Sequence, residues 1–495
     1  MSSCRPSVLL AIALLASFSA NCLAFRENWC SEEVHGGKRT GGAFRSFLPH
    51  DWKTCGDGSA GDPLFLTPLL KNGSIAEAVE LSAVHGVGGV TSYSGYLTVN
   101  EQYSSNMFFW FFPAQENPED APVLMWLQGG PGATSMYGLF VELGPLKATA
   151  SGNIEDMPIT WNKKYSLLFV DNPVGTGFSF TSNDAGYAKN QDDVARDLYS
   201  ALTQFFSIYT KFAKNDFYVT GESYAGKYVP SISAKIVEEN AQKEKPLINF
   251  KGMAIGDGLT DPLSMNKYYA NLMLQTSLID TFQASHVSEV AQNMTKAIRA
   301  RQFVSAFHMF DDLLNGDLIK YPSWYKNVTG TTNYFNILRS TSPADSSYFV
   351  TALNRDEVRK AIHVGNLPFH MGNTVEIHLL ADVQDSALEQ FLTVLKSDKN
   401  YKVMVYNGQL DIIVGVPLTE GMVSEMDWAG KEKFYNAARK IWKVNSTDAE
   451  VAGYVRSVLN LMQVVVRGAG HMVPHDQPVR ALDLISRFVD DFKPE

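Results

Sequence analysis

The stretch Phe217–Pro230, FYVTGESYAGKYVP, decides the fold because it fits two different turns between a strand and a helix. The run from Gly221 to Lys227 has the glycine and lysine spacing of a loop that binds phosphate groups. The shorter run around Ser223 is typical of a tight turn that exposes a nucleophilic serine. The two interpretations predict different chemistry from the same residues.

The residues that follow Lys227 argue against phosphate binding. A phosphate-binding loop carries Ser or Thr after its lysine to ligate Mg²⁺, and this chain has Tyr228 there. Pro230 should also interrupt the helix whose first turn would hold the phosphates. The serine turn fits better, because DFYVT predicts the preceding strand and small residues stand on both sides of Ser223.

Length and composition describe a large, acidic globular chain. The chain has 495 residues, of which 45% are hydrophobic, and a formal net charge of −10. It can therefore bury a large core, in roughly two to three structural units or in one large domain with an insertion. The acidic balance argues against nucleic acid and against an anionic membrane surface, because phosphate binding needs clustered Lys and Arg.

The first 24 residues, MSSCRPSVLLAIALLASFSANCLA, have the pattern of a secretory signal peptide. Arg5 precedes an apolar run shorter than the ~20 residues of a membrane span, and Ala24 marks the expected cleavage site. Cys30 and Cys55 are then the disulfide candidates, since the other two cysteines leave with the signal. A secretory context also makes four sequons candidates for glycosylation: Asn72, Asn293, Asn327 and Asn445.

The expected elements form an α/β core with an insertion. Aromatic and β-branched runs predict an antiparallel strand pair at SYSGYLTV and MFFWFFPA, and short apolar runs predict buried parallel strands at PVLMWL, SLLFV, DFYVT, KGMAI and KVMVYN. Helical periodicity over 193–212 and 479–492 completes an α/β pattern, whereas 280–303 is a long helix outside it. The expected organisation is a signal peptide (1–24), an N-terminal segment that includes a candidate propeptide (25–85), a first part of the core (86–261), an inserted, mainly helical cap (262–354) and a second part of the core (355–495).

A nucleophilic serine needs a base and an acid, and two downstream loops contain candidates. NGQLDIIV places Asp411 after the predicted strand KVMVYN, and GAGHMVPHDQP places His471 after the predicted strand LMQVVVRG. A turn aspartate that bonds its own backbone is the alternative for Asp411, and His475 is the rival of His471. The Gly-Ala-Gly run before His471 favours that residue, because it allows close approach. The chain has no HExxH and no Cys-x-x-Cys pair, so no metal centre is expected.

The loop WLQGGPG follows the predicted strand PVLMWL, where an acyl-transfer enzyme places N–H donors for the oxyanion. Gly129 and Gly130 can present bare N–H groups, and Pro131 stiffens the turn. A simple Gly-Pro turn is the structural alternative. A second donor is expected from the N–H of the residue after the nucleophile.

Six motifs, in order and spread over most of the chain, resemble the serine carboxypeptidases of the α/β-hydrolase fold: WLQGGPG, DNPVGTGFSF, GESYAGKYVP, AIGDGLTDP, NGQLDIIV and GAGHMVPHDQP. PLFLTPLLKNGSIAEA and the Gln of WLQGG are similar to the vitellogenic carboxypeptidase-like branch. The resemblance implies Ser223 as nucleophile, His471 as general base and Asp411 as its orienting acid. It also implies an oxyanion hole made by the N–H groups of Gly130 and Tyr224.

The resemblance further implies how a free C-terminus is recognised. Four residues would hold the terminal carboxylate of the substrate: Gln128, Gly129, Glu142 and Glu222. Two acids repel a carboxylate unless they are protonated, and crowding raises the pKa of a carboxyl group, so activity is expected at mildly acidic pH. Two residues depart from the family pattern, since Gln128 replaces the common Asn and Ala133 stands where many members have Cys.

The sequence therefore predicts a serine-type carboxypeptidase that hydrolyses the C-terminal peptide bond of peptides and proteins through an acyl-enzyme. No cofactor and no nucleic-acid or membrane partner is expected, and the oligomeric state is left open. The expected location is the secretory pathway, either secreted or in the lumen of a lysosome or yolk granule. Two alternatives remain: an acyltransferase of the same fold, and a catalytically silent binding protein that is secreted.

Overall fold

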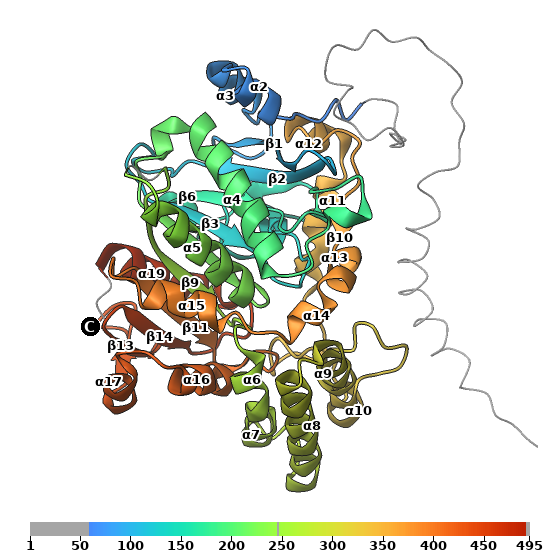
Figure 1. Ribbon diagram of the computed structural model, residues 1–495, viewed down its shortest axis with the longest axis vertical. Helices are drawn as coiled ribbons and strands as arrows, with labels where there is room; N and C mark the ends of the chain where they lie inside the picture. The colour runs from blue at the N-terminus through green and yellow to red at the C-terminus, as the bar shows by residue number, and fades with distance from the viewer. Residues whose placement is uncertain (1–58, 245–246, 492–495) are drawn as a thin grey trace, which may run out of the picture. The chain divides into compact units, whose positions relative to one another are not determined.

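The computed structural model describes residues 59–244 and 247–491 (Figure 1). From Ala60 onward these residues belong to one unit of the chain. The predicted signal peptide, Cys30 and Cys55 lie outside the described residues. No helix within the two described ranges combines the length and the apolar character that a membrane span requires.

A mixed sheet of ten strands runs through the described unit in the order β1-β2-β6-β3-β8-β9-β11-β14-β13-β12 (Figure 1). The strands from β6 to β14 are parallel, and antiparallel strands extend the sheet on both sides. The predicted large mixed sheet, with its antiparallel pair β1 and β2, is confirmed. The bounds are β1 (Tyr93–Asn100), β2 (Ser105–Phe112), β3 (Val123–Leu127), β6 (Ser166–Val170), β8 (Phe217–Glu222), β9 (Phe250–Gly256), β11 (Lys402–Gly408), β12 (Lys440–Trp442), β13 (Gly453–Val458) and β14 (Leu461–Val466).

Two short antiparallel pairs lie outside this sheet, β4 (Leu146–Ala148) with β5 (Ile154–Asp156) and β7 (Thr176–Gly177) with β10 (His370–Met371). The helices of the core flank the large sheet or follow its strands. Their bounds are α2 (Thr67–Lys71), α3 (Ile75–Leu81), α4 (Gln191–Ile208), α5 (Ala225–Ala241), α12 (Asp356–Ala361), α13 (Asn373–His378), α14 (Leu380–Val383), α15 (Leu388–Leu395), α16 (Val416–Glu425), α17 (Lys431–Asn436), α18 (Val473–Asp476) and α19 (Pro478–Ser486).

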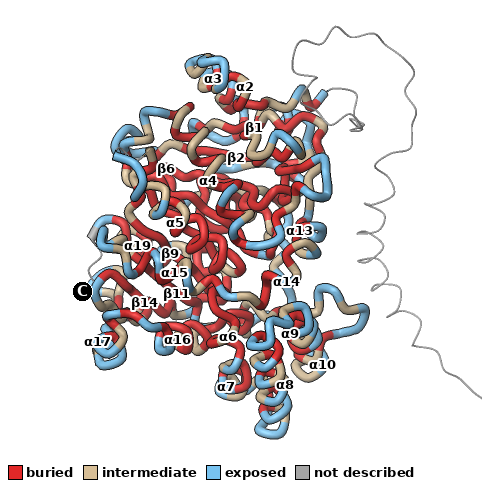
Figure 2. The backbone as a smooth tube through the Cα atoms, in the orientation of Figure 1, coloured by how far each residue is buried: buried red, intermediate tan, exposed pale blue. Residues whose placement is uncertain are grey.

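Neighbouring residues of β8 show how both faces of the sheet are covered. Phe217 packs edge-on against Phe206 of α4, with ring centroids 5.3 Å apart, whereas Tyr218 contacts Phe488 just beyond α19 at 5.7 Å. Successive side chains of a strand point to opposite faces, so α4 and the segment after α19 lie on opposite sides. The strands are accordingly buried throughout the centre of the molecule (Figure 2). This double burial explains why the parallel strands are continuous apolar runs.

Residues 64–81, inside the predicted N-terminal segment, pack as part of the core. The N–H of Leu66 donates to the carbonyl of Tyr96 at 2.9 Å, and the N–H of Tyr96 donates to the carbonyl of Leu64 at the same distance. Leu66 and Leu69 are buried in the main hydrophobic cluster. Removing these residues would expose apolar surface and unpair backbone groups, so any propeptide boundary is expected before Leu64.

Residues 262–354 contain helices and, among their described elements, no strand. The helices are α6 (Pro262–Met265), α7 (Tyr269–Gln275), α8 (Thr281–Arg299), α9 (Phe303–Phe310), α10 (Trp324–Thr329) and α11 (Tyr348–Leu353). Helices α7 to α10 gather at the lower end of the view in Figure 1. The status of this stretch as an inserted cap stays a prediction, as do the other domain boundaries.

Helix α5 contains Pro230 and is not interrupted by it, so that prediction from the sequence was wrong. Proline has no N–H to donate to the carbonyl four residues earlier. That carbonyl belongs to Gly226, and it accepts the hydroxyl of Thr260 at 2.8 Å instead. The side-chain hydroxyl replaces the missing backbone hydrogen bond, and the helix continues to Ala241.

Candidate active site

Ser223 occupies the turn between β8 and α5 in a left-handed backbone conformation. Its φ is 65°, which is uncommon for a residue with a side chain. The N–H of Ser223 donates to the carbonyl of Gly256 at 3.0 Å, and its own carbonyl accepts the N–H groups of Gly226 and Leu259, each at 2.9 Å. These contacts hold the strained turn in place, and Ser223 lines a cavity at the head of α5.

The loop after β3 lies directly against this turn. A Cβ atom on Gly129 would come within 2.5 Å of the backbone nitrogen of Tyr224 and 2.7 Å of the Ser223 Cβ. Only glycine permits this approach. Gly130 follows with a φ of 106°, a conformation that also favours glycine. The structure thus brings together the two segments that carry the predicted oxyanion donors, Gly130 and Tyr224.

Asp171 holds the residues that follow this loop, and it was not among the residues predicted from the sequence. Its Oδ1 accepts the hydroxyl of Thr134 at 2.5 Å and the N–H of Ser135 at 3.1 Å, and its Oδ2 accepts the N–H of Phe178 at 2.9 Å. Burial raises the pKa of Asp171 to about 7, against the effect of these donors. Its only signal in the sequence was its place in the motif DNPVGTGFSF.

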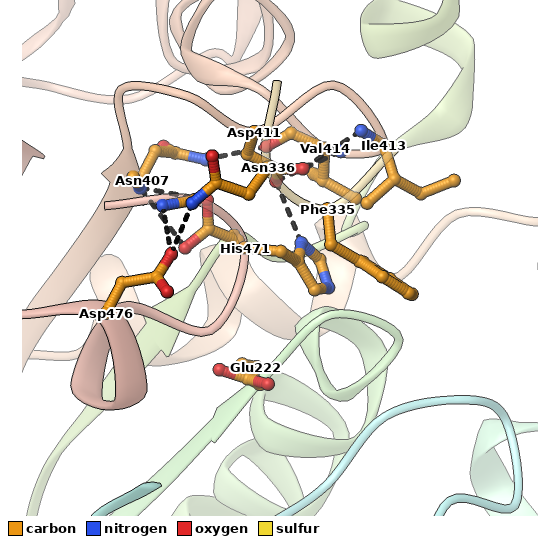
Figure 3. Close-up of polar contacts among 12 residues, drawn as sticks. Glu222, Phe335, Asn336, Asn407, Asp411, Ile413, Val414, His471 and Asp476 are labelled. Carbon is orange, nitrogen blue, oxygen red and sulfur yellow. Dashed lines mark hydrogen bonds and ion pairs between the residues drawn. The ribbon is translucent and has the colours of Figure 1, made fainter. Parts of the chain in front are cut away.

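His471 and Asp411 form a buried, hydrogen-bonded pair (Figure 3). Nδ1 of His471 lies 2.8 Å from Oδ2 of Asp411. The N–H groups of Ile413 and Val414 also donate to this carboxylate, at 2.9 and 3.2 Å. The carboxylate therefore favours a proton on Nδ1 and leaves Nε2 as the acceptor. Nε2 has no hydrogen-bond partner among the described residues, and its ring lines the same cavity as Ser223.

The rival histidine, His475, does not reach Asp411. Its Nδ1 lies 3.3 Å from Oδ1 of Asp476, and that hydrogen bond raises the pKa of His475. Asp476 in turn holds the loop of His471, because its Oδ2 accepts the N–H of Gly470 at 2.7 Å and the amide of Asn336 at 2.8 Å (Figure 3). The sequence-based preference for His471 over His475 agrees with this geometry.

Phe335 fixes the ring of His471 from the residues between α10 and α11. Its carbonyl accepts the N–H of His471 at 2.7 Å, and its ring lies beside the imidazole with centroids 5.2 Å apart (Figure 3). Gly470 permits this contact, since a Cβ there would come within 2.3 Å of the Phe335 carbonyl oxygen. Gly470 therefore allows the loop of His471 to approach Phe335 closely.

Three of the residues predicted to bind a carboxylate form a buried group. The indole N–H of Trp126 donates to Oε1 of Gln128 at 2.8 Å, which turns the amide so that its Nε2 donates to Oε1 of Glu222 at 2.7 Å. Within the described part of the chain, Oε2 of Glu222 and both oxygens of Glu142 have no hydrogen-bond partner. These buried oxygens are therefore free to form hydrogen bonds with a ligand or with water.

Both acids favour their neutral form. Burial raises the pKa of Glu222 well above its ordinary value, and the nearby charge of Glu142 raises it further. Burial also raises the pKa of Glu142. A protonated carboxyl group can donate a hydrogen bond to a carboxylate, whereas an ionised one repels it.

Asp257 is a further buried carboxyl group at the site, and it was not among the residues predicted from the sequence. An oxygen of Asp257, an oxygen of Asp411 and a nitrogen of His471 lie within 4.8 Å of one another. Such spacing is compatible with a metal ion, but each oxygen of Asp411 already accepts N–H groups and Nδ1 of His471 faces Asp411. The two backbone N–H groups and Nδ1 of His471 all point toward Asp411. This arrangement is typical of a carboxylate that orients a histidine, and not of one that binds a metal ion.

The cavity lined by Gln128, Glu222, Ser223 and His471 has a volume of about 420 Å³. Its apolar wall includes Tyr269, Phe307, Phe310, Phe349 and Met472. No Lys or Arg is among the described residues that line it, whereas Glu222, Asp317 and Glu376 are. Burial raises the pKa of Glu376 to about 7, with further contributions from Asp317 and Asp311.

Lys227 makes its contacts inside the protein. Its Nζ donates to the carbonyl oxygens of Asp382 and Asp385 and lies 3.8 Å from Oδ2 of Asp382. That carboxylate also accepts the hydroxyl of Tyr224 and the amide of Gln191. The lysine of the GESYAGK run therefore ties α5 to α14, and the phosphate-binding interpretation has no support in the structure.

The glycosylation candidates lie in different surroundings. Asn72, Asn327 and Asn445 are exposed, whereas Asn293 is half-buried within α8. Exposure is compatible with a sugar at the first three sites, and occupancy at all four stays a prediction.

Comparison with known proteins places this geometry in a family. The family described as serine carboxypeptidase, Peptidase S10, matches residues 85–491. "Probable serine carboxypeptidase CPVL" of Homo sapiens is 50% identical over 87% of this chain and 90% of its own length. "Venom serine carboxypeptidase" of Apis mellifera is 50% identical over 87% and 91%, and "Vitellogenic carboxypeptidase" of Aedes aegypti is 39% identical over 87% and 90%.

The crystal structure of Kex1(Δ)p, a prohormone-processing carboxypeptidase from Saccharomyces cerevisiae, has the same fold. It matches with a TM-score of 0.73 at 24% identity, over 83% of this chain and 96% of its own. The predicted α/β-hydrolase fold is thereby confirmed. On the sequence matches, the chain belongs to the serine carboxypeptidase family.

Proposed function

We propose that this protein is a serine carboxypeptidase that removes C-terminal residues from peptides through an acyl-enzyme at mildly acidic pH. One observation carries the proposal: Ser223 and His471, which is hydrogen-bonded to Asp411, line one cavity together with the buried acid Glu222, whose neighbour is Glu142. Ser223, His471 and Asp411 can perform acyl transfer, and the two acids can bind a free carboxylate.

The chemical steps follow from the positions of these groups. Oγ of Ser223 attacks the carbonyl carbon of the last peptide bond, and Nε2 of His471 takes the hydroxyl proton while Asp411 stabilises the charged ring. The N–H groups of Gly130 and Tyr224 donate to the oxygen that becomes negative. The C–N bond then breaks, His471 returns the proton to the leaving amine, and the free amino acid departs. Water, deprotonated by His471, hydrolyses the ester and restores Ser223.

Recognition of the free C-terminus is assigned to the buried group beside the nucleophile. Nε2 of Gln128, the N–H of Gly129 and the protonated carboxyl groups of Glu142 and Glu222 would donate to the substrate carboxylate. An amide at the C-terminus offers one oxygen acceptor where a carboxylate offers two, and brings N–H donors of its own. The group thus supports selection of an exopeptidase substrate.

The two alternatives differ from this proposal in measurable ways. An acyltransferase would form the same acyl-enzyme and pass it to an alcohol, so adding alcohols would divert most of the product to an ester. A silent binding protein would lack a competent triad, whereas Ser223, Asp411 and His471 are all present and the last two are hydrogen-bonded. A lumenal or secreted location is also proposed, supported by the venom relative and the exposed sequons.

The proposal is tested with N-blocked dipeptides of varied last residue, incubated with the full chain across acidic to neutral pH. We expect release of the C-terminal amino acid by the wild type and none by Ser223→Ala. A fluorophosphonate should label the wild type and should not label Ser223→Ala. A folded wild-type protein that neither reacts with the probe nor releases amino acids would support the binding protein instead.

A further inference from the structure

Asp257 is a buried carboxyl group beside the His471–Asp411 pair, and the mechanism above leaves it without a role. It follows β9 directly, with a φ of 44°, and its side chain is fully buried. The three side chains place a nitrogen and two carboxyl oxygens within 4.8 Å of one another. Two buried carboxyl groups this close do not both ionise, because like charges repel strongly away from water.

The hydrogen-bond donors indicate which of the two carries the negative charge. Asp411 accepts two backbone N–H groups and faces Nδ1 of His471. Asp257 accepts only the N–H of Gly408, at 3.0 Å to one oxygen and 3.3 Å to the other, among its described contacts. Since donated hydrogen bonds stabilise an ionised carboxylate, the charge belongs on Asp411 and the proton on Asp257.

The remaining titratable groups around Asp257 favour the same assignment. Glu222 on β8 and Tyr406 on β11 face it, and neither supplies a positive charge. Burial raises the pKa of Asp257 well above its ordinary value, and the charge of Asp411 and a hydrogen bond to it raise that pKa further. Asp257 is therefore protonated at mildly acidic pH.

We propose that Asp257 is a positioning residue that shares its carboxyl proton with Asp411 and so keeps His471 able to accept a proton at mildly acidic pH. A hydrogen bond donated to Asp411 spreads its negative charge, so Asp411 stabilises the protonated imidazole less strongly. His471 then remains a neutral base to lower pH. The inference rests on the proposed function, in which the acids that bind the substrate must be protonated while the base is not.

Fluorophosphonate labelling separates this effect from substrate binding, because the probe has no terminal carboxylate for Glu142 or Glu222 to bind. In that reaction Oγ of Ser223 bonds to phosphorus, fluoride leaves, and the hydroxyl proton passes to Nε2 of His471. The second-order rate constant measured across pH in the full chain therefore falls as His471 becomes protonated. The pH of half-maximal labelling in the free enzyme is the quantity to compare between variants.

Two variants of Asp257 separate a hydrogen-bond role from a packing role. Asp257→Asn keeps the size of the side chain, an acceptor for Gly408 and an N–H donor for Asp411, so the labelling midpoint should match the wild type. Asp257→Ala removes the donor and should move the midpoint upward by about 0.5 to 1 pH unit, the order expected for one hydrogen bond to a charged group. Where the alanine variant does not fold, Asp257→Ser supplies the same comparison, because its hydroxyl is too short to replace the carboxyl group.

Equal midpoints in the wild type and the alanine or serine variant would overturn the inference, as would a shift in Asp257→Asn as large as that in Asp257→Ala. A merely structural role lowers the labelling rate at all pH values and leaves the midpoint unchanged. Because labelling is independent of peptide cleavage, a wild type that labels as expected but releases no amino acid would contradict the proposed function alone.

Discussion

Nδ1 of His471 lies 2.8 Å from Oδ2 of Asp411, while Nε2 of the same ring is buried without a partner among the described residues. This one hydrogen bond orients the imidazole toward the cavity that Ser223 lines. It also favours the tautomer in which Nε2 can accept a proton. The two histidines of the GAGHMVPHDQP loop therefore differ in role, because His471 contacts Asp411 and His475 contacts Asp476.

Replacing Asp411 by Asn should therefore lower kcat by about 10⁴-fold, because the amide favours the wrong tautomer of His471. His471→Gln should lower kcat by about 10⁶-fold, with KM little changed. His475→Gln is the matched control in the same loop and should keep kcat within a few-fold. Steady-state kinetics on one blocked dipeptide check all three, and equal losses at His475 and His471 would reassign the base.

Glu222→Gln should flatten the pH dependence of KM. In the wild type the pKa of Glu222 is raised, so the acid is neutral and donates below that pKa, and ionises and repels the substrate carboxylate as pH rises through it. KM for free-acid peptides should rise with pH in the wild type and rise less in the variant, whose amide donates at every pH. Esters of the same peptides are the control, since they lack the carboxylate. An unchanged KM profile in the variant would remove Glu222 from carboxylate binding.

Glu376 should make the enzyme's choice of side chain depend on pH. Its pKa is raised to about 7 by burial and by Asp317 and Asp311, so it is mostly neutral in acid and gains negative charge toward pH 8, about one unit higher. The kcat/KM ratio of an Arg substrate to its neutral citrulline analogue should therefore increase with pH, at one of the two positions beside the scissile bond. Glu376→Gln should weaken that increase. A ratio that is constant with pH at both positions would show that Glu376 does not contact the substrate.

Lys227→Met should destabilise the fold by about 3 to 5 kcal/mol, because it leaves the buried carboxylate of Asp382 without its cation. Lys235→Met on the same helix is the matched control. Its ion pair with Glu239 lies at the surface and contributes about 0 to 1 kcal/mol. Urea unfolding of both variants measures the difference, and a Lys227→Met protein as stable as the control would show that the buried contacts contribute little.

The sheet and the nucleophile turn could be predicted because their signals are local. Strands buried on both faces are uninterrupted apolar runs, so SLLFV and KVMVYN stand out in the sequence. The turn at Ser223 needs small neighbours, and Gly470 before His471 needs to approach Phe335 closely. The order of serine, acid and histidine along the chain then predicts Asp411 and His471 as partners of Ser223.

Other parts of the site depend on contacts that have no local signal. Asp257 acquires its role from Asp411 and from Gly408, which is 151 residues away. Lys227 pairs with Asp382, which is 155 residues away, so its place in a motif that resembles a phosphate-binding loop is misleading on its own. Helix α5 passes through Pro230 only because Thr260 supplies the missing donor. A propensity rule cannot anticipate such a partner.

The most direct test of the account uses two peptides of identical sequence, one with a free C-terminal carboxylate and one with a C-terminal amide, followed by mass spectrometry at mildly acidic pH. We expect stepwise loss of C-terminal residues from the free acid, much slower loss from the amide, and no loss from either with Ser223→Ala. Equal cleavage of the two peptides, or cleavage at internal bonds, would contradict the assignment of the Glu142 and Glu222 group to a free C-terminus.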